Sequence, residues 1–164
     1  MPKAKKIYVA RAIRGEKSDL VEFFIPCVSL LVREHNHQII NPHVFENNPI
    51  EVLARTVFKK TAAELTAEEI QNFDIQRLNE SEIVIAEFSG ASTGVGREIE
   101  YARTKHSFGN PAANILCLHH KHYESSASPM IRGMSHRDYP NVFVHCYDKE
   151  NLRKILIEFF ARFI

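Results

Sequence analysis

Short apolar runs alternate along the chain with longer segments in which apolar residues recur at helical spacing. The apolar runs predict five strands, at residues 7–10, 38–42, 82–88, 114–118 and 142–146. Helices are predicted from 18 to about 35, weakly over 50–60, from 66 to about 79, from about 97 to 105, and from Asp148 or Asn151 onward. Pro26 should kink the first helix or displace its start. The longest stretch without a regular pattern is 119–139.

The alternation of strands and helices predicts an α/β fold. Strands that are apolar throughout belong in a parallel sheet covered on both faces, and right-handed crossovers leave few arrangements. We expect a single domain over residues 1–164 with a doubly wound, flavodoxin-like or Rossmann-like sheet of five parallel strands in the order 2-1-3-4-5. Such sheets bind ligands beyond the carboxyl ends of strands one and three, where the loops after Tyr8 and Glu87 meet.

Composition narrows the class of protein. The chain has 21 Lys and Arg against 20 Asp and Glu, a net charge of +1, which argues against a nucleic-acid partner. Apolar residues make up 45%, which excludes general disorder, yet no stretch reaches the roughly 18–20 apolar residues of a membrane span. Cys27, Cys117 and Cys146 lack CxxC spacing, which favours reduced thiols in the cytoplasm over disulfides or zinc. Because Cys117 and Cys146 lie in apolar strands, we expect both to be core thiols.

Two acidic residues stand where they could carry chemistry. Asp74 shares a helical stripe with Ile70 and Leu78 that should face the core, where an unpaired carboxylate is costly. Glu98 should lie in the first turn of a helix, whose N-terminus would hold it anionic. Each could instead be ordinary, Asp74 as a paired carboxylate at the rim and Glu98 as compensation for the helix dipole. Together they match the nucleophile and the acid of glycoside cleavage.

An anion could bind near the loop at 89–96, which is rich in small residues with free backbone N–H groups and hydroxyls. It matches neither a Walker loop nor a GxGxxG fingerprint. Arg14, after the first strand, is either a phosphate ligand or a surface arginine. His119-His-Lys-His122 has no carboxylate or cysteine at ligand spacing, so a solvated loop fits it better than a metal site. We therefore expect no metal and no cofactor.

The order of several segments resembles that of a known enzyme family. The segments are Ile7-Tyr-Val-Ala-Arg-Ala-Ile-Arg-Gly15, the helix with Asp74, the strand at 82–88, Ser92-Thr-Gly-Val-Gly-Arg-Glu98 and Ser128-Pro-Met-Ile-Arg-Gly133. They follow one another as in the 2'-deoxynucleoside 5'-phosphate N-hydrolases, within the nucleoside 2-deoxyribosyltransferase superfamily. The resemblance covers nearly the whole chain, and its specific parts are the GVGxE and SxMIRG segments.

This resemblance implies a role for several residues. Glu98 corresponds to the nucleophile at the anomeric carbon, Asp74 to the acid that assists the leaving base, and Tyr8 to a tyrosine near the sugar. The phosphate-binding positions correspond to Arg14, Gly15, Ser92, Gly94 and Ser128. His43 and Ile13 correspond to the base and sugar pocket. In the family the serine matching Ser128 reaches in from the neighbouring subunit, so a homodimer is implied.

The chain departs from the family pattern at two places. Arg11 and Ala12 stand where the family usually has a small residue and a serine, so one phosphate-binding hydroxyl is missing. Arg11 could replace it with a charge or could shrink the pocket. The segment between His43 and Asp74 is longer than in the animal hydrolases and borders the base pocket. Base preference, and the choice between ribose and deoxyribose, therefore do not transfer.

The predicted activity is hydrolysis of the base–sugar bond of a nucleoside 5'-monophosphate, without metal or cofactor, through a glycosyl-enzyme on Glu98. A nucleoside 2-deoxyribosyltransferase, which passes the sugar to a second base, is one alternative. A nucleotide-binding module without catalysis is another, because a fold does not settle a function.

Overall fold

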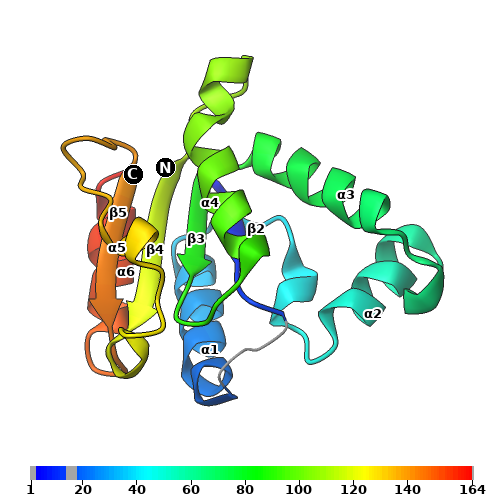
Figure 1. The fold of residues 1–164 in the computed structure, drawn as a ribbon, viewed down its shortest axis with the longest axis horizontal. Coiled ribbons are helices and arrows are strands. Elements are labelled where there is room, and N and C mark those ends of the chain that lie inside the picture. Colours follow the sequence, from blue (N-terminus) through cyan, green and yellow to red (C-terminus); the bar gives the residue numbers. More distant parts are fainter. Residues whose placement is uncertain (1–2, 14–17, 164) are drawn as a thin grey trace.

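The computed structural model, which describes residues 3–13 and 18–163, contains one parallel sheet of five strands (Figure 1). The strands are β1 (Lys6–Ala10), β2 (Gln38–Ile39), β3 (Ile83–Glu87), β4 (Asn114–His120) and β5 (Val142–Tyr147). Their order is β2-β1-β3-β4-β5 and every neighbouring pair is parallel. This confirms the predicted fold class and strand order, and it brings the carboxyl ends of β1 and β3 side by side.

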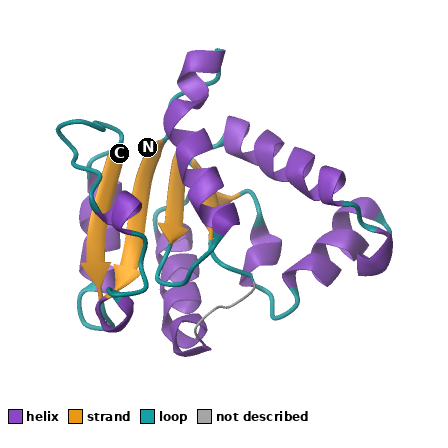
Figure 2. Cartoon of the chain, in the orientation of Figure 1, coloured by secondary structure: helices purple, strands orange, loops and turns teal. Residues whose placement is uncertain are grey.

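Helices precede or follow each strand (Figure 2). The α-helices are α1 (Ser18–Glu34), α2 (Pro49–Leu53), α3 (Ala67–Glu80), α4 (Thr93–Thr104), α5 (Pro129–Arg132) and α6 (Leu152–Ala161). Shorter turns are η1 (Pro42–Phe45), the π-helical η2 (Ala54–Phe58), η3 (Ala62–Glu64), η4 (Lys105–Phe108) and η5 (Lys121–Tyr123). None of the helices in the described part of the chain is long and apolar enough to cross a membrane.

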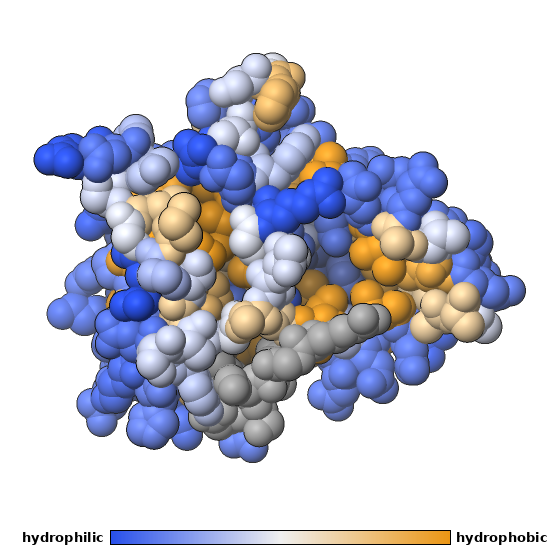
Figure 3. Space-filling model, viewed as in Figure 1, coloured by the Kyte–Doolittle hydropathy of each residue, from blue (hydrophilic) through white to orange (hydrophobic). Residues whose placement is uncertain are grey.

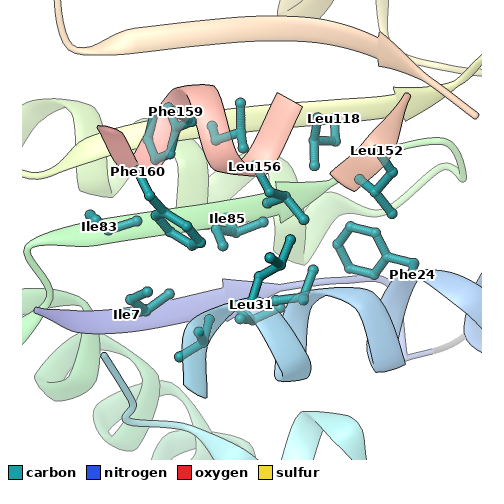
Figure 4. Close-up of a cluster of buried hydrophobic side chains, with 14 of the residues drawn as sticks. Ile7, Phe24, Leu31, Ile83, Ile85, Leu118, Leu152, Leu156, Phe159 and Phe160 are labelled. Atoms are coloured by element: carbon teal, nitrogen blue, oxygen red, sulfur yellow. The ribbon is translucent and has the colours of Figure 1, made fainter. Parts of the chain in front are cut away.

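The sheet separates two apolar layers because successive side chains of a strand point to opposite faces. Ile7 and Val9 of β1 face α1 and α6 in the larger cluster, which Figure 4 shows in part. Tyr8 and Ala10 face the other side, where α3 and α4 pack. The second layer is the one that matters for the site, because it brings a tyrosine of β1 under both helices that carry the candidate carboxylates.

The second strand is shorter than predicted, and Asn41 explains why. Its side chain is fully buried, accepts a hydrogen bond from the Val9 amide at 3.0 Å and donates one to the Val9 carbonyl at 2.8 Å. The amide side chain thus takes over the pairing with β1 that a longer β2 would have made. Pro42 then begins η1, so the chain turns away from the sheet toward α2.

Two predicted segments differ from the structure, whereas the predicted starts of the first and last helices agree with it. The segment at 50–60 divides into α2 and η2, and it ends at Lys59 in a left-handed conformation. Residues 119–139 contain the end of β4, then η5 and α5, and so are not wholly irregular. Pro26 lies inside α1, which still begins at Ser18. Of the two residues offered for the last helix, Asn151 precedes its first residue.

Candidate active site

Three polar side chains meet where β1, α3 and α4 come together. Tyr8 is 1% exposed, and its hydroxyl donates a hydrogen bond of 2.7 Å to Glu98 Oε1. The same hydroxyl interacts with the carboxyl of Asp74. Asp74 is half-buried on α3 and Glu98 is half-buried on α4. The three residues that the sequence singled out as catalytic therefore form one cluster.

Burial dominates the electrostatics of this cluster. Loss of solvent raises the pKa of Asp74 to about 6, although the interaction with Tyr8 opposes the rise. Loss of solvent raises the pKa of Glu98 to about 8, and the nearby charge of Asp74 adds to the rise. Burial and the two carboxylates hold the pKa of Tyr8 well above 10. Tyr8 is therefore a neutral hydrogen-bond donor at neutral pH.

The expected effect of the helix N-terminus on Glu98 was wrong. Helix α4 begins at Thr93 with Ser92 as its N-cap, so Glu98 is the sixth helical residue. The field of a helix terminus acts mainly within the first turn. Burial in the second turn therefore decides the pKa of Glu98, and the carboxyl favours its protonated form where an anion was expected.

The carboxyls line a cleft between α3 and α4, formed by two cavities of about 660 and about 250 Å³. Both cavities share Ile70, Asp74, Gly94 and Glu98. Asp74 thus faces this cleft, and not a closed core as its stripe had suggested. Apolar side chains gather around the hollow between α4 and the α2–α3 side (Figure 3). A cleft that joins apolar walls to a few polar groups is the usual form of a small-molecule site.

The N-terminus of α4 opens onto the larger cavity. Ser92 and Gly94 both line it, and the Ser92 hydroxyl accepts a hydrogen bond of 3.2 Å from the Val95 amide. A Cβ on Gly94 would meet Ser92 Oγ at 3.7 Å, an ordinary contact, so packing within the chain does not demand glycine. Glycine instead leaves the backbone of the first turn accessible from the cavity.

The remaining phosphate candidates are Arg14, Gly15 and Ser128. Arg14 and Gly15 lie outside the described residues. Ser128 is half-buried, precedes α5, and lines neither of the two cavities. The cleft of one chain therefore contains, among the described residues, Ser92 and Gly94 from the predicted phosphate set.

The residues predicted for the base side differ in position. Ile13 is 41% exposed and lines the larger cavity. His43 lines neither cavity and packs its ring against Phe73, with 5.5 Å between ring centroids. Burial and the charge of Arg11 lower the pKa of His43 to about 4, so the imidazole is neutral at pH 7.

Arg11 has a structural task as well as a place in the cavity wall. It is 7% exposed, and its guanidinium donates hydrogen bonds to the carbonyls of Val44 and Glu46. Arg11 also lines the larger cavity. The side chain thus ties the turn after β2 to the end of β1, a role that the sequence did not indicate.

One wall of the larger cavity was missed by sequence reasoning. Ile50 contributes to it from α2, and Ala62 and Leu65 contribute from the segment between α2 and α3. Their spacing matches neither a clean helix nor a strand, which is why the pattern over 50–60 gave only a weak prediction. The one available signal was the extra length of this segment beside the expected base pocket.

Two expectations about side chains elsewhere were wrong. His119 is 5% exposed and packs against Phe88, so it is no part of a solvated loop. Cys146 is exposed, whereas Cys117 is buried as expected and its pKa is raised to about 12 by burial. Within residues 3–13 and 18–163, no group of three or more His, Cys, Asp or Glu could hold a metal ion.

Comparison with curated proteins finds relatives with one shared name. A Methanosarcina mazei protein provisionally named 2'-deoxynucleoside 5'-phosphate N-hydrolase 1 is 31% identical over 160 residues, which cover 94% of this chain and 83% of that protein. A Methanosarcina barkeri protein with the same provisional name is 30% identical over 162 residues, covering 96% and 86%. No family model matches the chain.

Comparison with solved structures finds the same architecture in a CMP N-glycosidase, BcmB of Clostridium botulinum. The two structures share a TM-score of 0.55 over 96% of this chain and 99% of that chain, at 18% sequence identity. At that identity the likeness speaks for the fold alone. The relatives from Methanosarcina carry the assignment further, since about 30% identity extends over most of both chains. This chain belongs to the 2'-deoxynucleoside 5'-phosphate N-hydrolase family.

Proposed function

We propose that this protein hydrolyses the N-glycosidic bond of a nucleoside or 2'-deoxynucleoside 5'-monophosphate, releasing the free base and the sugar 5-phosphate. The observation that carries the proposal is the cluster of Tyr8, Asp74 and Glu98 in one cleft. The names of the relatives, which refer to nucleoside 5'-phosphates, support the same substrate class.

The proton count of the carboxyl pair suits this reaction. With pKa values of about 6 and about 8, Asp74 and Glu98 together hold one proton near pH 7. Cleavage through a glycosyl-enzyme requires one carboxylate to attack and one carboxylic acid to protonate the leaving group. The Tyr8 hydroxyl is hydrogen-bonded to Glu98 and interacts with Asp74, so it is the proposed path by which the proton passes from Glu98 to Asp74.

In the proposed first step, a Glu98 carboxylate oxygen forms a bond to the anomeric carbon. The bond from that carbon to the base nitrogen breaks, its electron pair goes to the base, and Asp74 supplies the proton. Tyr8, which donates to Glu98 Oε1, leaves the second carboxylate oxygen for attack. In the second step, water attacks the same carbon, Asp74 accepts its proton, and the Glu98 carboxylate leaves.

The covalent route is favoured over direct attack by water because both carboxyls lie beside one phenolic hydroxyl: Tyr8 donates a hydrogen bond to Glu98 and interacts with Asp74. Retaining glycosidases hold their two carboxyls closer together than inverting enzymes do, because inverting enzymes leave room for a water.

The phosphate would bind at the N-terminus of α4, where Ser92 and Gly94 line the larger cavity. Phosphate held there by backbone amides and a hydroxyl would position the anomeric carbon against Glu98. We also propose that the protein acts as a homodimer, and that Ser128 serves the site of a second copy. Its position outside both cavities of its own chain is consistent with that arrangement.

The test is base release from a panel of ribo- and deoxyribonucleoside 5'-monophosphates, measured by chromatography, with the matching nucleosides alongside. Release from monophosphates that is lost in Glu98→Gln supports the proposal and identifies the base. Equal release from nucleosides would contradict the phosphate role. A new nucleoside after addition of a free base would indicate transfer, and tight binding without release would indicate a binding module.

A further inference from the structure

Three residues of helix α4 and the turn after it face the end of α3. Glu98, Tyr101 and Lys105 stand at positions i, i+3 and i+7, which lie on one side of a helix. Glu98 belongs to the catalytic cluster. Tyr101 and Lys105 lie farther along the same side, away from the N-terminus of α4, and neither lines the two cavities.

Lys105 is fully buried and its ammonium group is bound to the end of α3. Nζ lies 2.7 Å from the carbonyl oxygen of Leu78, 2.6 Å from that of Ser81 and 3.2 Å from that of Asn79. These carbonyls belong to the last turn and the C-cap, where carbonyls lack the usual helical N–H partner; that of Leu78 also accepts from the backbone N–H and the hydroxyl of Ser81. The Tyr101 hydroxyl adds a hydrogen bond of 2.8 Å to Asn79 Oδ1.

We infer that Lys105 is a positioning residue for cleavage of the N-glycosidic bond: by clamping the end of α3 to the end of α4, it sets the distance between Asp74 and Glu98. This inference rests on the roles proposed above for the two carboxyls. Asp74 and Leu78 share one side of α3, so the clamped turn is the one next to the acid.

Asp74 lies close enough to the bound end of α3 for a small tilt of the helix to displace its carboxyl. At 1.5 Å per residue Asp74 stands about 6 Å from Leu78 along α3, so a tilt of about 10° at the clamped end displaces Asp74 by about 1 Å. Displacement of a reacting group by about 1 Å can reduce a rate by about 100-fold. Helix α4 packs against three strands, β1, β3 and β4, whereas α3 packs against β1 alone among the strands and extends outward beside the cleft (Figure 1), so α3 is the helix that would move.

Simple filling of space does not account for a lysine here. Burial of an ammonium group costs free energy, and a methionine of similar length would occupy the volume without that cost. Only a charged group with three donors can bind carbonyls of Leu78, Asn79 and Ser81 together. The ammonium group of Lys105 therefore serves to hold the end of α3 in a fixed orientation.

The test compares Lys105→Met and Tyr101→Phe with Leu156→Ala. Leu156 is fully buried in the opposite layer, so its substitution destabilises the protein without touching α3 or α4. For Lys105→Met we expect kcat to fall about 10- to 100-fold while KM for the monophosphate changes less than about threefold. Tyr101→Phe removes one hydrogen bond and should change kcat in the same direction by less.

A second readout separates positioning from stability. When α3 moves away, Glu98 loses the influence of Asp74 and gains solvent, so its pKa should fall toward 4.5. The alkaline limb of the pH–rate profile, and the titration of the ¹³C-labelled Glu98 carboxyl by NMR, should both move to lower pH in the clamp variants. Leu156→Ala should leave both unchanged.

The inference is overturned if the clamp variants lose stability but keep the wild-type profile and NMR titration. If Lys105→Met does not fold, Tyr101→Phe decides by the same two measurements. Failure of the proposed function has a different signature, because the wild-type protein itself would then release no base, or Glu98→Gln would remain active.

Discussion

Replacing Glu98 with glutamine should abolish turnover and, at alkaline pH, make the protein more stable. The change keeps the shape of the side chain and keeps an oxygen that can accept the Tyr8 hydrogen bond. It removes a carboxyl whose pKa is about 8 in the folded protein and near 4.5 in the unfolded chain. Between those pH values the folded wild-type protein retains a proton that the unfolded chain has lost, so its stability falls as pH rises.

The size of this effect follows from the two pKa values. The difference between about 8 and 4.5 corresponds to about 5 kcal/mol at 1.36 kcal/mol per pKa unit, if Glu98 titrated alone. Part of the rise in the pKa of Glu98 comes from the charge of Asp74, and solvent in the cleft screens the charges. We therefore expect the free energy of unfolding of Glu98→Gln to exceed that of wild type by about 1–3 kcal/mol above pH 8. For a chain of this length that is a rise in Tm of about 3–10 °C.

The assay is thermal unfolding of wild type and Glu98→Gln at pH 5 and pH 9. The Tm of the variant should exceed that of wild type at pH 9 and nearly equal it at pH 5. Glu100→Gln is the matched control, because Glu100 lies on the same helix but pairs with Arg103, which lowers its pKa. A Glu98→Gln variant that is less stable than wild type at pH 9 would refute the reasoning.

Three further predictions follow from the same geometry. Base release should follow a bell-shaped pH–rate profile with limbs near pH 6 and pH 8, since activity needs one proton shared by Asp74 and Glu98; a flat profile over this range would contradict it. Ser92→Ala should cost about 1 kcal/mol through loss of the N-cap and should raise KM several-fold for monophosphates alone, measured against the matching nucleosides; equal changes in both would count against a phosphate contact. Asn41→Ala should cost about 2–3 kcal/mol in denaturant unfolding because both backbone groups of buried Val9 lose their partner, and a loss below about 1 kcal/mol would contradict the account of β2.

The strand order could be predicted because it depends on features that the sequence displays directly. Each strand is a short apolar run, and the helices between them force parallel pairing with right-handed crossovers. The cluster of Tyr8, Asp74 and Glu98 was reached by the resemblance together with these positions. Asn41 could not be assigned its role, because a side chain that replaces a strand pair leaves no periodic signal.

The electrostatics of the site could not be read from the chain. Gly94 and Gly96 were counted as loop residues, although both lie in the first turns of α4, and this placed Glu98 one turn too near the helix N-terminus. The pKa of Glu98 depends on how deeply α3 and β1 cover it, which only the packed structure reveals. Lys105 was overlooked for the same reason, since its partners are backbone carbonyls of another helix.

The most direct test of the central claim is a search for the glycosyl-enzyme. Wild-type protein would be mixed with a monophosphate that it cleaves, quenched in acid within the first turnover, digested, and examined by mass spectrometry. The proposal predicts a sugar 5-phosphate attached to the peptide that contains Glu98 and to no other, absent when Glu98 is glutamine. Rapid base release with an unmodified Glu98 peptide at every quench time, together with an active glutamine variant, would contradict it.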